Sequence, residues 1–96
     1  TAIACGNDMI ALGAFRALRE VGYRIPQDIS LVGFDDVYLS TVMEPRMTTV
    51  RQPAYELGIA AVKMLAKRIS KEPLEEKNIC FKPVLIKRDT VAPRRR

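Results

Sequence analysis

Asn7 and Asp35 are the two residues of this sequence best placed to bind a ligand. Each follows a short apolar segment typical of a buried strand, residues 1–5 and 29–34. In open parallel sheets, ligands bind beyond the carboxyl ends of the strands, so two neighbouring strands would direct both side chains into one crevice. An amide offers a donor and an acceptor and a carboxylate offers acceptors, which together suit a sugar or a purine. The alternative is that each residue only caps the segment after it.

The adjacent carboxylates of Asp35 and Asp36 admit two other interpretations. Paired carboxylates can hold a divalent metal, but such a site would need a further strand-end Asp and a nearby Lys, which the strand ends do not supply. They can also perform acid–base catalysis, although neighbouring side chains on one chain usually diverge. The sequence has no His and no Gly-rich phosphate loop, which removes the usual general base and the commonest metal ligand. We therefore predict no catalytic residue, no metal site and no cofactor.

The composition is that of one small globular domain. The chain has 96 residues, of which 48% are hydrophobic and 28% charged, which argues against a disordered segment. Lys and Arg number 16 against 11 Asp and Glu, and residues 94–96 supply three of the positive charges. A solvated basic tail is the simpler interpretation, and a phosphate-contacting patch is the alternative. Because Trp is absent and aromatic residues make up 6%, we expect no base-stacking platform.

Cys5 and Cys80 both lie in apolar runs without a C-x-x-C spacing. We expect both to be buried small hydrophobes with reduced thiols, which favours a cytoplasmic setting. No apolar run approaches the roughly 18 residues of a membrane span. The chain opens without an initiator Met or a signal-peptide pattern, so we expect it to be part of a longer protein.

The hydrophobic pattern alternates between strand and helix, which predicts an α/β fold. The first 34 residues have the size of a strand–helix–strand unit with parallel strands. Asn7 or Asp8 can cap the first helix, and Gly22 can end it. The second long helix carries an apolar stripe that the few strands scarcely cover, which again indicates a fragment. The expected strands are 1–5, 29–34, 48–50 and part of 79–88, with an edge or a bend at Pro83; the expected helices are 9–22, one or two turns in 37–43, and 53–70.

Four segments in register resemble one protein family. Residues 5–14 are similar to its A-N-D-x-M-A-L-G-A pattern, and residues 25–36 to V-P-x-D-I-S-V-V-G-F-D-D. Residues 45–53 look like P-x-L-T-T-V-R-Q-P, and Leu57-Gly58 with residues 85–90 complete the series. The family is the lactose-repressor/galactose-repressor group of bacterial transcriptional regulators, and the resemblance covers nearly the whole chain.

This resemblance implies a fragment of a type I periplasmic-binding-protein-like fold, with two lobes built from parallel sheets flanked by helices. Residues 1–47 would belong to the C-terminal lobe and 48–52 would cross to the N-terminal lobe. Residues 53–77 would form a helix and loop of that lobe, and 78–96 a return strand and basic tail. The whole would be a cytoplasmic, homodimeric or larger regulator. A small-molecule effector, of sugar or of nucleoside or purine type, would allosterically control operator binding by a helix-turn-helix headpiece that this chain lacks.

The resemblance also assigns roles to individual residues. Asn7 and Asp35 match positions that contact the effector. Leu12, which lies about 100° from the core-facing row of its helix and is otherwise a simple exposed residue, matches a dimer contact. The other expected dimer contacts are Arg16, Val42 and Met43, and the expected lobe-crossover residues include Thr49, Arg51 and Gln52.

Two other classes of protein compete with this interpretation. An exported sugar-binding protein of a transport system shares the fold, although the crossover at Gln52-Pro53 and the ending at Lys87-Arg88 look more like the regulators. An enzyme, such as a small phospho-acceptor or hydrolase, is disfavoured by the absence of His and of a nucleophile motif.

Overall fold

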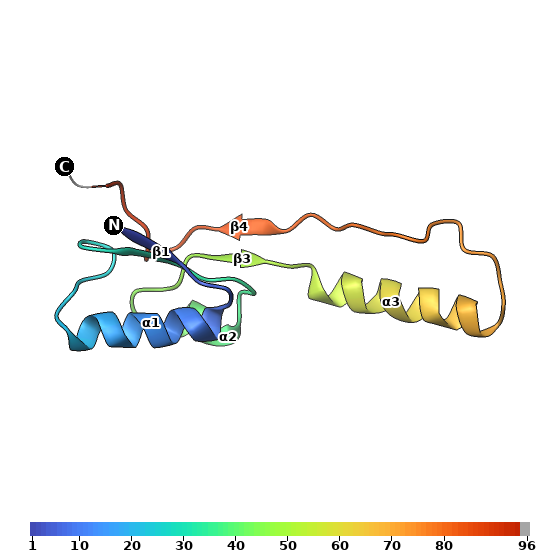
Figure 1. Cartoon of the computed structure of the whole chain (residues 1–96), viewed down its shortest axis with the longest axis horizontal. Coiled ribbons are helices and arrows are strands. Elements are labelled where there is room, and N and C mark those ends of the chain that lie inside the picture. The colour runs from blue at the N-terminus through green and yellow to red at the C-terminus, as the bar shows by residue number, and fades with distance from the viewer. Residues whose placement is uncertain (95–96) are drawn as a thin grey trace. The chain divides into compact units, whose positions relative to one another are not determined.

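The computed structural model describes residues 1–94 and contains the expected alternation of strands and helices (Figure 1). Every expected element is present, with ends that differ by a few residues. The order is β1 (Ala2–Ala4), α1 (Asp8–Glu20), β2 (Ser30–Val32), α2 (Tyr38–Val42), β3 (Thr49–Arg51), α3 (Ala54–Ile69) and β4 (Val84–Ile86). The chain divides into two compact units, which are described separately: residues 1–51 together with the chain from Val84 onward, and Gln52–Pro83.

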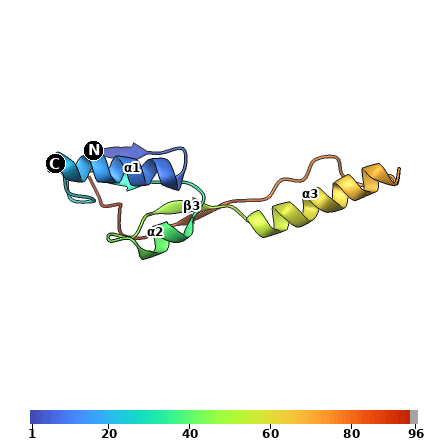
Figure 2. The ribbon, with the colours of Figure 1, turned by 90° about the horizontal axis from the view of Figure 1, so that it is seen from below.

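The first unit begins with a parallel β1–α1–β2 arrangement, as predicted. Ala2 pairs with Ser30 and Ala4 with Val32. Figures 1 and 2 show α1 running back alongside β1 in the opposite direction, as a crossover between parallel strands requires. The apolar residues of α1 recur at helical spacing (Ala11, Ala14, Phe15 and Leu18), and the face they form points inward onto a small core. Ala11, Ile25, Leu31 and Met47 are buried in this core, and Cys5, Ala14, Phe15, Leu18 and Met43 pack against it.

Both ends of α1 follow from local residue chemistry. Asn7 has an extended backbone, and its side-chain oxygen accepts a hydrogen bond from the N–H of Ile10 at 2.8 Å. The capping prediction for Asn7 is therefore confirmed. At the other end, Gly22 adopts a φ of 92°, and the N–H of Tyr23 reaches back to the carbonyl of Leu18 at 2.9 Å. Glycine suits this left-handed position because it has no Cβ.

The second strand pair is antiparallel, in contrast to the parallel sheets that the resemblance implies. Thr49 pairs with Ile86 and Arg51 with Val84, because β3 leads out of the first unit and β4 leads back into it. The strand expected within residues 79–88 is present as Val84–Ile86, and it begins directly after Pro83. The physical reason is that β3 ends at Arg51, opposite Val84, so the residues before Val84 find no strand partner in the described part of the chain.

The second unit consists of α3 and the loop that follows it. No residue of α3 is buried, and its apolar stripe is exposed, with 67% of Val62 and 74% of Ile69 accessible. One side of α3 and the half-buried Leu74 and Phe81 line a cavity of about 390 Å³. The prediction that Cys80 is buried is wrong: its thiol is exposed, because the segment around it belongs to no sheet among residues 1–94.

Candidate functional site

The predicted meeting of two loops at one sheet edge is confirmed in the first unit. Asn7 and Asp35 each stand three residues beyond the end of their strand, and those strand ends, Ala4 and Val32, are paired in register. The backbone N–H of Asp8 donates to the carbonyl of Phe34 at 2.8 Å, which joins the two loops directly. Parallel neighbouring strands thus carry both residues to the same edge of the sheet.

The two candidate residues differ in burial. Asn7 is half-buried and spends its side-chain oxygen on the cap of α1, so the chemistry it can offer a ligand is that of its amide N–H groups. Asp35 is exposed, and its carboxylate offers acceptors. One amide donor and one carboxylate at the same edge form a pairing suited to polar hydroxyl or N–H groups.

The loop of Asp35 and Asp36 has an unusual backbone. Asp35 has a φ of 115° and Asp36 a φ of 59°, both in the region of positive φ that residues other than glycine rarely adopt. Such conformations persist where surrounding bonds impose them. Here β3 does so: Asp35 N–H donates to the carbonyl of Val50 at 2.9 Å, and Asp36 N–H donates to the hydroxyl of Thr49 at 3.3 Å.

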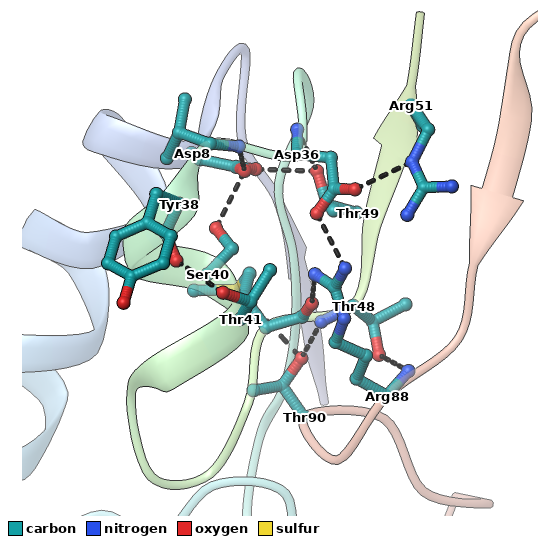
Figure 3. Close-up of polar contacts among 12 residues, drawn as sticks. Asp8, Asp36, Tyr38, Ser40, Thr41, Thr48, Thr49, Arg51, Arg88 and Thr90 are labelled. Carbon is teal, nitrogen blue, oxygen red and sulfur yellow. Dashed lines mark hydrogen bonds and ion pairs between the residues drawn. The ribbon is translucent and has the colours of Figure 1, made fainter.

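The adjacent carboxylates have different surroundings, since Asp35 is exposed whereas Asp36 lies between two arginines. The Asp36 side chain is only 6% exposed and points between two guanidinium groups (Figure 3). Its Oδ2 lies 2.8 Å from Nε of Arg51, and its Oδ1 lies 2.6 Å from Nη2 of Arg88. Burial alone would raise the pKa of Asp36, but hydrogen bonds and positive charge from Arg51 and Arg88 hold it below its usual value.

Asp8 is a second buried carboxylate, which sequence reasoning considered only as a possible helix cap. It is 2% exposed and accepts three hydrogen bonds (Figure 3). Oδ2 accepts from Val37 N–H at 2.9 Å and from Ser40 Oγ at 2.6 Å, and Oδ1 accepts from Thr49 Oγ1 at 2.6 Å. A signal was available, since Asp8 precedes Ala11 by three residues and so lies on the core-facing row of α1. An acidic residue in that row needs buried donors.

Thr90 links the segment that follows β4 to β2 and to the residue just before β3. Its hydroxyl donates to the carbonyl of Leu31 at 2.6 Å and accepts from the N–H of Thr48 at 2.9 Å. The N–H of Arg88 donates to Thr48 Oγ1 at 2.9 Å. These bonds hold Arg88 in the position from which its guanidinium contacts Asp36. A continuous set of polar contacts therefore runs from Asp8 through Thr49 and Asp36 to Arg88.

The remaining predicted residues have varied surroundings. Leu12 is half-buried, and Arg16 is exposed with its guanidinium 3.4 Å from Glu20. Val42 is 55% exposed, whereas Met43 packs partly against the core of its own chain. Of the predicted crossover residues, Thr49 is fully buried, Arg51 is the last residue of the first unit and Gln52 the first of the second.

Two further properties concern residues 1–94. Their His, Cys, Asp and Glu side chains form no group of three or more that could hold a metal ion. None of their helices combines the length and apolar character needed to cross a membrane.

A βαβ unit with polar loops at the carboxyl edge is linked by an outgoing and a returning strand to a second unit, an arrangement of the binding-protein type of α/β fold. Residues 1–91 match the family model described as the periplasmic binding protein-like domain, and the chain belongs to this family.

The curated relatives are transcriptional regulators. The chain is 43% identical over 89 residues to the uncharacterized HTH-type transcriptional regulator YvdE of Bacillus subtilis, covering 93% of this chain and 28% of the relative. It is 45% identical over 92 residues to the HTH-type transcriptional repressor PurR of Klebsiella pneumoniae, covering 96% and 27%. The chain thus spans little more than a quarter of the length of these relatives.

The solved structures similar to this chain are also transcriptional regulators. Transcriptional regulator LacI from Bacillus cereus subsp. cytotoxis superposes with a TM-score of 0.92 at 34% identity, over 99% of this chain and 34% of that one. A LacI-family regulator from Enterococcus faecium with bound ribose gives 0.84 at 34% identity, over 99% and 36%. The lac repressor dimer bound to operator and an anti-inducer gives 0.85 at 37%, over 95% and 32%. The resemblance to the lactose-repressor family is confirmed, and an exported transport protein is not favoured.

Proposed function

We propose that this chain is the C-terminal part of the effector-binding domain of a LacI-type transcriptional regulator. The observation that carries the proposal is the common offset of Asn7 and Asp35 beyond two paired parallel strands. A ligand at this edge would control operator binding by a helix-turn-helix headpiece elsewhere in the same protein. The regulatory relatives and the operator-bound lac repressor support this assignment.

The effector is a small hydroxyl-rich molecule of the sugar class. The Asp35 carboxylate accepts hydrogen bonds from ligand hydroxyls and the Asn7 amide donates to ligand oxygens. The ribose bound to the Enterococcus faecium regulator supports a sugar. The name of PurR is the support for a purine, whose N–H groups the same carboxylate would accept. The site binds without turnover, uses no cofactor and operates in the cytoplasm.

The two units correspond to parts of two lobes in this proposal. Residues 1–47 belong to the C-terminal lobe, 48–52 to the crossover, 53–77 to the N-terminal lobe and 78–96 to the return. Leu12, Arg16, Val42 and Met43 contribute to a homodimer contact; Arg16 and Val42 are the more exposed of these. Effector binding changes the relative angle of the two lobes, and the dimer transmits this change to the headpieces. The effector site and the operator site are thereby coupled through two global states of the protein.

The test uses the full-length protein that carries this chain. Its affinity for the operator upstream of its own gene is measured with and without each of a panel of pentoses, hexoses, disaccharides and purine bases that includes ribose. We expect one class of compound to change operator affinity at least about fivefold, the lower end of typical allosteric couplings. Asp35→Ala should abolish that response and leave operator binding without effector intact.

Glu72→Ala is the matched control, because Glu72 is an exposed carboxylate that belongs to the second unit and not to the loops at the sheet edge. It should respond like the wild type. An unchanged response in Asp35→Ala would overturn the site assignment, and specific operator binding that no compound in the panel alters would count against a small-molecule effector.

A further inference from the structure

The Asp36 carboxylate connects the loop of Asp35 to both members of the β3–β4 pair. One partner, Arg51, is the last residue of β3, and the other, Arg88, lies two residues beyond the end of β4. Figure 3 shows the carboxylate between the two guanidinium groups. A single side chain next to the candidate effector residue is thus held by two segments that are far apart in the sequence.

These two segments are the connections between the two units. The chain leaves the first unit after Arg51 and re-enters it at Val84, four residues before Arg88. Any change in the position of Asp36 therefore acts on the outgoing and the returning connection together. Thr49, also on the outgoing strand, reinforces the link by accepting the Asp36 N–H and donating to Asp8.

The two ion pairs differ in character. The Arg88 side chain is 10% exposed and also donates from Nη1 to the carbonyl of Met47 at 3.1 Å, so its guanidinium is fixed. The Arg51 side chain is 56% exposed. A buried pair is costly to break on one side only, whereas an exposed pair contributes little to stability. Asp36–Arg88 is accordingly the anchor, and Asp36–Arg51 is a contact that can be removed without unfolding the unit.

We propose that Asp36, Arg51 and Arg88 form a positioning cluster that transmits effector occupancy at the Asp35 loop to the two connections between the units. The inference rests on the proposed function, since it deepens the account of the same site. An effector that bonds to Asp35 displaces a loop already held in an uncommon backbone conformation, and Asp36 passes that displacement to Arg51 and Arg88. Interfaces and packed cores answer small shifts by moving between discrete arrangements, and the proposal assigns this behaviour to the three side chains.

The experiment measures the ratio of operator affinities with and without effector for the full-length protein. The effector used is whichever compound of the panel described above, which includes ribose, changes the operator affinity of the wild type. It is applied at a saturating concentration for each variant. Asp36→Asn keeps the size of the side chain and removes its charge. We expect its ratio to fall at least about fivefold relative to wild type, with effector-free operator affinity unchanged.

Arg51→Gln keeps the anchor pair and the fold, so it decides the question even if Asp36→Asn does not fold; its ratio should fall as well, and Arg51→Lys should recover part of it. The control is Asp89→Asn, which removes the exposed pair between Asp89 and Arg46 at 2.9 Å in the same unit. That variant should respond like the wild type.

Full recovery of the response at saturating effector in both Asp36→Asn and Arg51→Gln would overturn the proposal, because these residues would then serve ligand affinity alone. An absent response in the wild type would instead contradict the proposed function itself, so the two failures are distinguishable.

Discussion

The hydroxyl of Thr49 donates to the carboxylate of Asp8 at 2.6 Å, although 41 residues separate them. Both side chains are buried, and this bond joins the first turn of α1 to β3. The Asp8 carboxylate also accepts hydrogen bonds from the hydroxyl of Ser40 in α2 and from the N–H of Val37, the residue just before α2. One carboxylate therefore fixes three elements around the loop that carries Asp35.

Replacement of this carboxylate should be strongly destabilising. Asp8→Ala leaves the hydroxyls of Ser40 and Thr49 and the N–H of Val37 without their acceptor. We expect the free energy of unfolding to fall by about 3 kcal/mol or more, since each unsatisfied buried group costs about 1–3 kcal/mol. Urea unfolding of the full-length protein measures this. Glu20→Ala, on the exposed end of the same helix, should change stability by about 0.5 kcal/mol or less, and equal losses in the two variants would contradict the role of Asp8.

Gly33 should tolerate no side chain. A Cβ there would collide with the Asp8 carboxylate and approach its Cα to 3.2 Å, and the backbone of that buried residue cannot move aside. We expect Gly33→Ala to lower the free energy of unfolding by about 1–3 kcal/mol, the usual range for overpacking. Gly13→Ala is the matched control, because a Cβ at that helical position has no atom within 4 Å and alanine favours the helix. Thermal unfolding measures the stability of both variants. If both lost the same free energy of unfolding, the steric argument would be refuted.

Asn7 has a capping role in the structure and a proposed ligand role, and two substitutions separate them. Asn7→Ala removes the cap and should cost about 1 kcal/mol of stability. Asn7→Ser keeps a side-chain oxygen for the N–H of Ile10 but loses the amide donors, so stability should be nearly retained while effector affinity falls. Isothermal titration and urea unfolding are measured side by side. Wild-type effector affinity in Asn7→Ser would leave Asn7 as a cap alone.

The Asp36 cluster should make stability depend on acidity. Because Arg51 and Arg88 lower the folded-state pKa of Asp36, its contribution is fully present above the unfolded value of about 3.9 and is lost as pH falls through the folded value. The wild type should therefore be more stable than Asp36→Asn near neutral pH, and this advantage should shrink toward pH 3. Urea midpoints between pH 3 and pH 6 measure the difference. A constant difference over that range would show that the ion pairs do not titrate in this way.

Much of the architecture could be predicted from local patterning. The order of strands and helices, the inward face of α1, the cap at Asn7 and the stop at Gly22 all depend on residues within a few positions of one another. The different surroundings of Asp35 and Asp36 are also a local matter, since adjacent side chains rarely share a direction. The placement of Asn7 and Asp35 at one edge needed only that two short strands be parallel neighbours, which the size of the crossover favours.

The polar partners of the site depended on the tertiary structure. Asp8 meets Thr49, Asp36 meets Arg88, and Thr90 meets Leu31 across 59 residues. Residue type shows that a buried carboxylate or hydroxyl needs a partner, but not which of many distant donors or acceptors closure of the chain will bring to it. The exposure of Cys80 has the same origin: its apolar run resembles a buried strand, yet burial requires a neighbouring strand, and among residues 1–94 none lies beside it.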